Sequence, residues 1–276
     1  MRLFNKVAII GVGLIGGSIA LAIKEKKLAN KIIGVSRHRK SLLLAHKRGA
    51  IDEGSQKINI IKDADLLILA TPVNTILNLA PRIYQLIDSG CIVIDVGSTK
   101  QEIVPRLTKL FPYFVGCHPL AGSEKRGIIH ANAKIFNNSL CILTPIEKTD
   151  MQAKKKIKIF WTKLGAKVLY LTPSIHDRIL SFVSHLPHVV AFSLIASIPK
   201  NYLKLASPSL KYTTRIAASD AQLWVDIFLT NKKNMLNAIK LLEKNISQIK
   251  TAIHKKDSEG LTKIFKIAKK KRELLR

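Results

Sequence analysis

The stretch Lys-Val-Ala-Ile-Ile-Gly-Val-Gly-Leu-Ile-Gly-Gly-Ser, residues 6–18, decides the fold of the first half of the chain. Residues 6–10 read as a buried strand, and apolar residues recur at helical spacing after the glycines. In a Gly-x-Gly-x-x-Gly turn the first glycine permits the bend, the second lets the backbone approach a pyrophosphate, and the third lets the helix pack on the strand. The sequence therefore predicts a dinucleotide-binding turn. Its predicted cofactor-binding residues are Gly11, Gly13, Leu14, Ile15 and Gly16.

Strand and helix patterns alternate through the rest of this half. The further strands that we expect are Lys31–Val35, Asp65–Ala70, Cys91–Val96, Tyr113–Cys117, Leu140–Leu143 and Lys167–Leu171. The helices that we expect between them are Ser41–Arg48, Ile76–Ile87, Gln101–Leu110 and one that ends at Leu164. Repeated units with nearly continuous apolar strands predict an α/β fold of the Rossmann type, with a doubly wound parallel sheet.

Ligands of such sheets bind at the carboxyl ends of the strands. The candidate residues at those ends are Gly11, Ser36, Thr71, Ser98 and His118. Thr71 and Pro72, which end the strand 65–70, complete the predicted cofactor-binding set.

From Thr172 onward no strand pattern is evident. Apolar residues at spacings of three and four form a seam, which consists of Met235, Ile239, Leu242, Ile246, Ile249 and Ile253. Such a seam packs inside a helical bundle or joins two subunits. We predict a dinucleotide-binding Rossmann domain at 1–172 and a smaller all-helical substrate and dimerisation domain at 173–276.

The composition bounds the class of protein. The 276 residues are 47% hydrophobic, which gives ample material for a core, and the net charge is +28. Most of the lysines and arginines are interspersed among apolar residues at helical spacing, so solvated helix faces explain the charge better than a binding arm does. We expect no nucleic-acid partner.

The three cysteines, Cys91, Cys117 and Cys141, show no Cys-x-x-Cys pair and no metal-type spacing to histidine. Scattered thiols in an odd number suit a reducing compartment, so we expect a cytoplasmic protein without a metal site. The apolar stretch Ile179–Ile198 contains two histidines and a proline, which favours a buried helix of a soluble domain over a membrane span.

Four side chains are candidates for the chemistry. His118 follows a strand in a loop rich in glycine and proline, where an imidazole can serve as a general base or hydrogen-bond acceptor. Ser98 either orients that imidazole or caps the next helix. His185 contacts substrate or fills a helix kink, and no third ligand supports a metal site with His188. Arg215 either binds a carboxylate bidentately or is an exposed helix charge.

The end of the second strand bears on the cofactor. An NAD enzyme usually places Asp or Glu about 20 residues beyond the glycines, where the carboxylate binds the ribose 2′-hydroxyl. This chain has Ser36 and Arg37 there, and no acidic residue lies between Gly34 and Ala50. Because hydroxyl and guanidinium groups bind the 2′-phosphate that a carboxylate would repel, we predict NADP as the cofactor, with NAD as the alternative.

Together these segments resemble the prephenate and arogenate dehydrogenase family of tyrosine biosynthesis, over essentially the whole chain. The resemblance is carried by Gly-Val-Gly-Leu-Ile-Gly-Gly-Ser at 11–18, Ala-Thr-Pro at 70–72, Asp-Val-Gly-Ser-Thr-Lys at 95–100, Gly-Cys-His-Pro-Leu-Ala-Gly at 116–122, Ser-His-Leu-Pro-His at 184–188 and Thr-Arg-Ile-Ala at 214–217. The first two segments occur in many dehydrogenases. The segments that contain His118 and His185 are much more specific.

The resemblance implies oxidative decarboxylation of a cyclohexadienol, prephenate or arogenate, by a homodimer. It implies that His118 accepts a hydrogen bond or proton from the ring hydroxyl, assisted by Ser98, while hydride leaves for the nicotinamide. It also implies that Arg215 binds a substrate carboxylate and that His185 lines the pocket of nicotinamide and substrate.

Two alternatives stay open at this point. A β-hydroxyacid dehydrogenase is also a Rossmann reductase with a helical second domain, but it is expected to carry a catalytic lysine on a helix beyond the sheet. A basic nucleic-acid-binding protein would explain the charge, but the chain has only 6% aromatic residues and no recognised nucleic-acid motif.

Overall fold

A computed structural model describes residues 2–275 of the chain. It contains two compact units, one up to Asn231 and the other from Lys232 onward. The boundary predicted at 172/173 separates sheet from helices and falls inside the first of these units. That a substrate and dimerisation domain begins at residue 173 remains a prediction.

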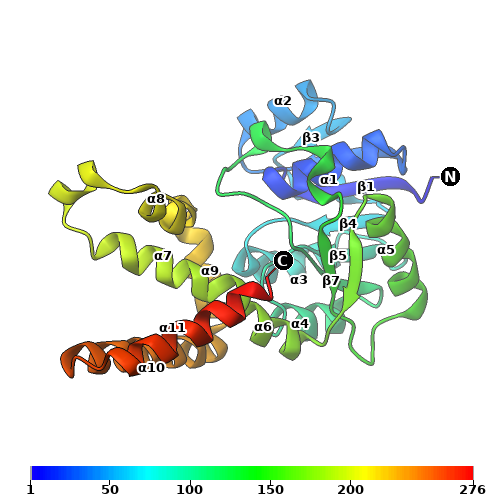
Figure 1. Ribbon diagram of the computed structural model, residues 1–276. Coiled ribbons are helices and arrows are strands. Elements are labelled where there is room, and N and C mark those ends of the chain that lie inside the picture. Colours follow the sequence, from blue (N-terminus) through cyan, green and yellow to red (C-terminus); the bar gives the residue numbers. More distant parts are fainter. Residues whose placement is uncertain (1, 276) are drawn as a thin grey trace. The chain divides into compact units, whose positions relative to one another are not determined.

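The first unit is built on an eight-stranded sheet of order β3-β2-β1-β4-β5-β6-β7-β8 (Figure 1). The strands are β1 (Phe4–Ile10), β2 (Ala29–Val35), β3 (Glu53–Ser55), β4 (Leu66–Leu69), β5 (Ile92–Asp95), β6 (Phe114–Pro119), β7 (Leu140–Leu143) and β8 (Lys167–Tyr170). All neighbouring pairs are parallel except β6 and β7. The doubly wound α/β fold is thus confirmed, with one antiparallel pair that the sequence did not predict.

The antiparallel pair and the short β3 have local causes. Between β6 and β7 the chain forms only two 3-10 turns, η2 (Ile128–His130) and η3 (Ala133–Phe136), with no α-helix to carry a parallel crossover. Strand β3 is three residues, Glu-Gly-Ser, without an apolar run, and it pairs with the edge of β2. Neither feature leaves a periodic pattern in the sequence.

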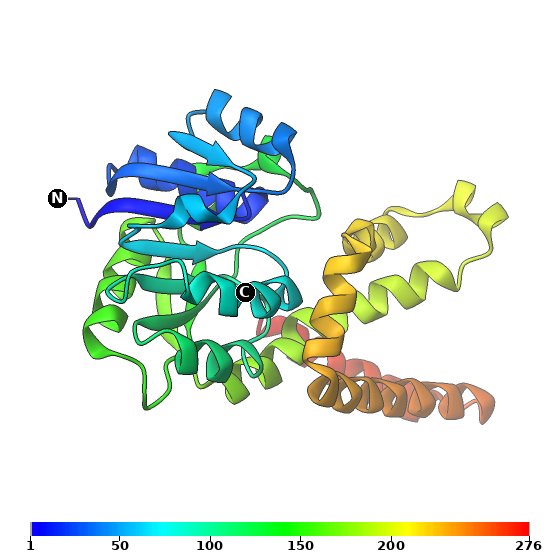
Figure 2. The same cartoon turned by 180° about the vertical axis from the view of Figure 1, so that it is seen from behind.

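Helices cover both faces of the sheet. The alternation of side chains along β1 sends Val7 and Ile9 into one core and Ala8 and Ile10 into the other. The first core is shared with α1 (Leu14–Glu25), α2 (Arg39–Lys47) and α5 (Met151–Lys163). The second core is shared with η1 (Ile58–Ile61), α3 (Val73–Tyr84) and α4 (Ile103–Leu110) (Figure 2).

The strand order reverses direction at β1. The chain runs outward from β1 through β2 to β3, and then returns to place β4 on the other side of β1. The carboxyl ends of β1 and β4 therefore flank the topological switch point, where open α/β sheets bind their ligands.

Helices follow β8 within the same unit. They are α6 (Pro173–Leu180), the π-helical turn η4 (Ser181–His185), α7 (Leu186–Ala196), η5 (Lys200–Leu205), α8 (Pro208–Thr214), η6 (Arg215–Ala218) and α9 (Ala221–Thr230). Hydrogen bonds tie them to the sheet domain, including Asn74 Nδ2 to Asp226 Oδ1 at 3.0 Å and Thr99 to Thr230 at 2.9 Å between the hydroxyl oxygens.

The stretch Pro173–Ala196 is long and apolar enough to cross a membrane, judged by length and composition alone. Its hydropathy is 1.8, and only 22% of its most apolar window is buried. The same stretch carries Asp177 and His185, whose side chains are buried in polar contacts described below.

The second unit is a hairpin of α10 (Lys232–His254) and α11 (Ser258–Glu273). Asp257 caps α11 by accepting a hydrogen bond from the Gly260 N–H at 2.8 Å. Within the predicted seam Met235 is buried, whereas Ile246 and Ile253 are 55% and 61% exposed. The predicted helix is confirmed, and the C-terminal part of its apolar seam is exposed at Ile246 and Ile253.

Candidate active site

The glycine turn lies at the carboxyl end of β1. Gly11 has φ +101°, and a Cβ on it would lie 2.5 Å from the Ala70 oxygen, while a Cβ on Gly16 would lie 2.0 Å from the Gly11 oxygen. A Cβ on Gly13, in contrast, would meet no atom within 4 Å. Gly13 is the N-cap of α1 and no side chain caps the helix, so the space beside its first N–H groups is open, and we call this turn the glycine cradle. This arrangement fits a pyrophosphate, held by backbone N–H groups and the helix dipole.

Thr71 and Pro72 lie beside this turn, at the carboxyl end of β4. The methyl group of Thr71 approaches the position of a Gly11 Cβ to 2.9 Å. Its buried Oγ1 has no hydrogen-bond partner among residues 2–275. A buried hydroxyl without a partner costs stability, so Thr71 Oγ1 fits a polar ligand such as a dinucleotide.

Ser36 and Arg37 follow β2 at the same edge. The Gly11 N–H donates to the Val35 oxygen at 2.8 Å, which fixes the end of β2 next to the turn. The Ser36 hydroxyl accepts the His38 N–H at 3.2 Å, and the exposed Arg37 guanidinium donates from Nε to His38 Nε2 at 3.1 Å. Residues 36–40 present hydroxyl and cationic groups, and no carboxylate, at the strand end that in Rossmann folds lies near the adenosine ribose.

His118 is the next-to-last residue of β6, opposite Ile142 of β7, and not in the loop after the strand as the sequence suggested. Pairing with β7 extends the strand through the His-Pro dipeptide. The side chain is half-buried at the carboxyl edge, and its Nδ1 lies 2.8 Å from His176 Nε2. The pKa of His118 lies well below its ordinary value because burial disfavours imidazolium, with His176, Lys100 and His185 adding to the effect.

Ser98 lies just beyond β5, the parallel neighbour of β6, and is half-buried. Within the described residues 2–275 no hydrogen bond joins Ser98 to His118. The role of Ser98 in orienting the imidazole therefore remains a prediction for the ligand-bound protein.

A buried polar network, which the sequence analysis missed, supports His118 from behind. His176 and Asp177 of α6 are fully buried, and His176 Nδ1 lies 2.7 Å from Asp177 Oδ1. Asp177 also accepts the backbone N–H groups of Lys100 at 2.8 Å and Gln101 at 2.8 Å. The only signal in the sequence is a His-Asp pair at the start of an otherwise apolar helical stretch.

Lys100 is the second feature that the sequence analysis missed. Its ammonium group is fully buried, pairs with the fully buried Asp95 carboxylate, and donates to the Gly97 oxygen at 2.7 Å. Asp95 also accepts the N–H groups of Gly97 at 2.8 Å and Cys117 at 3.3 Å. The pair ties the loop after β5 to Cys117, the residue before His118 in β6.

His185 lies at the end of the π-helical turn and is 1% exposed. Its Nδ1 lies 3.2 Å from Asn231 Nδ2, and Nε2 has no hydrogen-bond partner in the described part of the chain. Burial lowers the pKa of His185 to about 4, so the ring is neutral at pH 7. The unsatisfied Nε2 is consistent with a ligand contact.

His188 and Trp224 stack, with ring centroids 3.4 Å apart and planes at 23°. His188 Nδ1 lies 3.1 Å from the Ser184 oxygen. Residues 2–275 hold no group of three or more His, Cys, Asp or Glu side chains that could bind a metal.

Arg215 begins η6 and is 58% exposed in its side chain. Its Nη1 lies 2.5 Å from Oε2 of Glu124, in the loop that follows His118. The arginine pairs with a carboxylate of its own chain, and its binding of a substrate carboxylate remains a prediction.

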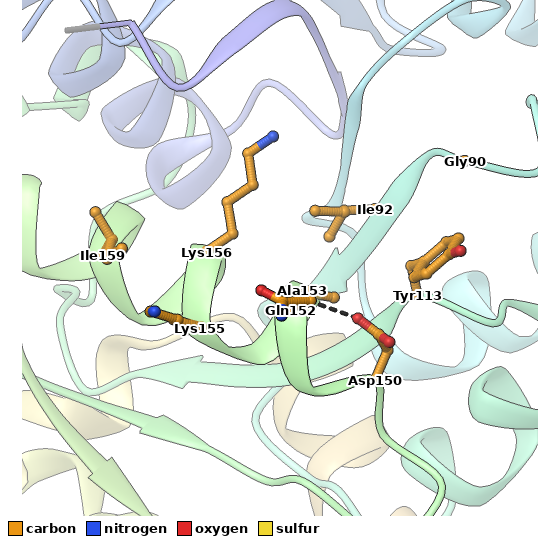
Figure 3. A pocket seen from close by; sticks show the side chains of 9 residues that line it. All are labelled: Gly90, Ile92, Tyr113, Asp150, Gln152, Ala153, Lys155, Lys156 and Ile159. Atoms are coloured by element: carbon orange, nitrogen blue, oxygen red, sulfur yellow. Dashed lines mark hydrogen bonds between the residues drawn. The ribbon is translucent and has the colours of Figure 1, made fainter.

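A shallow hollow elsewhere on the first unit lies at the opposite edge of the sheet (Figure 3). It is lined by Ile92 at the start of β5, Tyr113 just before β6, and residues of α5 near its cap Asp150. Because ligands of open α/β sheets bind at the carboxyl edge, this hollow is not the nucleotide site.

The glycine turn at the switch point and His118 at the same edge of the sheet are the features of a nucleotide-dependent dehydrogenase. Two family models agree with this class. The nucleotide-binding domain of prephenate dehydrogenase matches residues 19–170, and the dimerization domain of prephenate dehydrogenase matches residues 172–267. The chain belongs to the prephenate dehydrogenase family.

Individual relatives match over nearly the full chain. The prephenate dehydrogenase of Bacillus subtilis is 36% identical over 98% of this chain and 76% of its own length. The cyclohexadienyl dehydrogenase of Zymomonas mobilis is 32% identical over 100% of this chain and 98% of its own. The crystal structure of Aquifex aeolicus prephenate dehydrogenase with hydroxyphenyl propionate and NAD+ superposes with a TM-score of 0.90, at 34% identity, over 99% of this chain and 98% of that one.

Proposed function

We propose that the chain oxidises and decarboxylates prephenate to 4-hydroxyphenylpyruvate, in tyrosine biosynthesis, with reduction of a nicotinamide cofactor. The observation that carries the proposal is the position of His118. Its half-buried imidazole lies at the carboxyl edge that also holds the glycine cradle, in a chain that matches both domains of the family. Arogenate, which has an amino group in place of the keto group of prephenate, is the alternative substrate.

His118 acts on the ring hydroxyl in this reaction. The imidazole accepts the hydroxyl proton as the ring carbon is oxidised, and it returns the proton to the phenolic oxygen. The carbon–carbon bond to the ring carboxylate breaks, its electron pair completes the aromatic ring, and carbon dioxide leaves. The nicotinamide, when bound, accepts the hydride from the carbon that bears the hydroxyl. No net proton is consumed, and aromatisation makes the step effectively irreversible.

A steady-state assay of the purified chain with prephenate and arogenate, each with NAD and NADP, tests the proposal. We expect turnover of prephenate with release of carbon dioxide. Absence of turnover with both cyclohexadienols, or oxidation of a simple hydroxyacid instead, would overturn it.

NADP is the proposed cofactor, on the evidence of the loop after β2. Arg37→Ala should lower kcat/KM for NADP by about 10-fold to 100-fold and leave the NAD value unchanged, because it removes a charge-assisted hydrogen bond to the 2′-phosphate. The measurement compares the two cofactors at low salt. Lys47→Ala removes the same charge from an exposed position at the far end of α2 and should change neither value. A preference for NAD in the wild type, or an unchanged NADP value in Arg37→Ala, would exclude this phosphate site.

Arg215 is the proposed partner of a substrate carboxylate, which would take the place of Glu124. Arg215→Ala should raise KM for prephenate about tenfold or more and leave cofactor affinity intact, because a guanidinium–carboxylate contact is lost. Arg126→Ala is the matched control, since Arg126 lies in the same loop as Glu124 and its Nη1 pairs with Asp220 Oδ2 at 2.6 Å. An unchanged KM in Arg215→Ala would make Arg215 a surface charge.

A homodimer is the proposed assembly, because the family model of residues 172–267 is a dimerization domain. The helix surfaces agree: α7 is apolar but has only Ala191 buried, and Ile246 and Ile253 of α10 are exposed. Light scattering at micromolar concentration should give twice the chain mass of 30.7 kDa. A monomer mass would show that these surfaces are not a stable interface.

We also infer that the protein works in the cytoplasm. A second subunit that covers the apolar surface of Pro173–Ala196 accounts for this stretch in a soluble enzyme, and all three cysteines are free and buried. Burial raises the pKa of Cys91 to about 12, which keeps this thiol protonated.

The nucleic-acid alternative has its own test. DNA binding with a steep salt dependence in a mobility-shift assay would support it.

A further inference from the structure

We propose that His176 is a positioning residue that holds His118 in one tautomer, with Nδ1 protonated and Nε2 free to accept a proton. The role of that Nε2 in turnover rests on the proposed function, whereas the tautomer itself does not. The carboxylate of Asp177 sets the direction of the whole chain of hydrogen bonds.

The geometry is a continuous line of short contacts. His118 Nδ1 lies 2.8 Å from His176 Nε2, and His176 Nδ1 lies 2.7 Å from Asp177 Oδ1. The two rings are tilted by 59°, with centroids 5.1 Å apart. His176 and Asp177 have no exposed surface, so water does not compete for these contacts.

Asp177 lies at the end of this chain of contacts and acts as a hydrogen-bond acceptor. Its Oδ1 takes the Lys100 N–H and its Oδ2 takes the Gln101 N–H, both at 2.8 Å. Because both oxygens of this side chain already accept backbone N–H groups, Asp177 is also the acceptor toward His176. His176 Nδ1 must therefore carry the hydrogen in the contact with Asp177.

The tautomer of His118 follows from this assignment. A neutral His176 with its proton on Nδ1 has a lone pair on Nε2, so Nε2 accepts. His118 Nδ1 must then donate, and in a neutral ring this leaves the lone pair on His118 Nε2. His118 Nε2, which makes no contact with His176, thus has a lone pair that can accept a proton.

Burial disfavours the charged form of both rings, and the neighbouring charges act on His176 in opposite directions. Burial lowers the pKa of His176, opposed by its hydrogen bond to Asp177, and the buried Lys100 ammonium lowers it further. Lys100 and His185 also face His118 and disfavour imidazolium there, while Asp95 lies beyond Lys100 and is paired with it. With both histidines neutral, the direction of the hydrogen bonds is the only one that satisfies every donor.

Two substitutions at position 176 separate positioning from simple packing. His176→Leu fills the space but removes the acceptor, whereas His176→Gln retains an amide oxygen that accepts from His118 Nδ1 and an N–H that donates to Asp177. We expect His176→Leu to lower kcat at least tenfold, within the range of about 10²–10⁴-fold that a general base contributes. KM for prephenate and the dissociation constant of the cofactor should stay unchanged. His176→Gln should recover kcat to within a few-fold of the wild type.

The second readout is a long-range ¹H–¹⁵N spectrum of ¹⁵N-histidine-labelled full-length protein at pH 7 without substrate. His118 is identified by its absence from the His118→Asn spectrum. The wild type and His176→Gln should show His118 with Nδ1 protonated and Nε2 unprotonated, and His176→Leu should show a mixture of both tautomers.

Each outcome decides the inference. A wild-type His118 with its proton on Nε2 would overturn it, as would equal losses of kcat in the glutamine and leucine variants. If the spectra agree but the wild type does not oxidise prephenate, the hydrogen-bond direction stands and the proposed function fails. If His176→Leu does not fold, the glutamine variant and the wild-type spectrum still give the answer.

Discussion

Replacing His118 with asparagine should lower kcat by about two to four orders of magnitude, the contribution typical of a general base. Asparagine retains a hydrogen-bonding side chain at the end of β6 but cannot take the proton of the ring hydroxyl. Cofactor affinity should change little, because the glycine cradle lies at β1 and β4. Steady-state kinetics with prephenate and a fluorescence titration of the cofactor measure the two effects.

The control is His130→Asn, the same change at an exposed histidine of η2, which should leave kcat unaltered. Near-normal turnover in His118→Asn would exclude His118 as the base. A loss confined to KM would make it a binding residue instead.

The pH profile gives a further test of the same side chain. The base is active when unprotonated, and burial places the pKa of His118 well below the ordinary value of 6.5. Protonation of His118 should therefore not lower kcat/KM as the pH falls through 6.5. The decline that it causes should come only at lower pH. A decline centred on the ordinary histidine value would show that the imidazole is more solvated than the structure indicates.

The carboxyl edge of the sheet around the glycine turn could be predicted from the sequence, because the residue patterns that mark it are local. The turn from β1 to α1 depends on glycines a few residues apart, and at Gly11 and Gly16 the structure leaves no room for a Cβ, whereas Gly13 has open space beside it. The sequence also placed Thr71 and Ser36 at this edge correctly, because each follows an apolar strand, while their contact with a cofactor remains a prediction. A parallel sheet brings all such ends to one edge without further information.

The buried residues that hold His118 in place could not be predicted in this way. His176 and Asp177 are 58 and 59 residues beyond His118 in the numbering, and only the docking of α6 on the sheet brings them together. Lys100 looked like one more cation in a chain of net charge +28, yet it is fully buried. A single sequence contains no pattern that distinguishes a buried lysine from the many exposed ones.

Breaking the Lys100–Asp95 pair should strongly destabilise the protein. Lys100→Met fills much of the same volume but leaves the Asp95 carboxylate buried without its cation, and removing one partner of a buried pair costs about 3–5 kcal/mol. Burial already raises the pKa of Asp95, and the loss of Lys100 removes the main opposing influence, so this carboxyl group should take up a proton. Urea unfolding of the variant, followed by circular dichroism, measures the loss in the free energy of unfolding.

Two further variants show whether the charge pair is the cause. Lys31→Met makes the same substitution in an exposed pair with Glu53, whose side chains are 49% and 47% exposed, and should cost less than about 1 kcal/mol. The double variant Lys100→Met, Asp95→Asn removes both charges while the asparagine oxygen still accepts from Gly97 or Cys117. It should be more stable than Lys100→Met alone, because an asparagine needs neither a buried cation nor the uptake of a proton. If the second substitution brings no recovery, the loss in Lys100→Met comes from the Gly97 contact or from packing, and not from the stranded carboxylate.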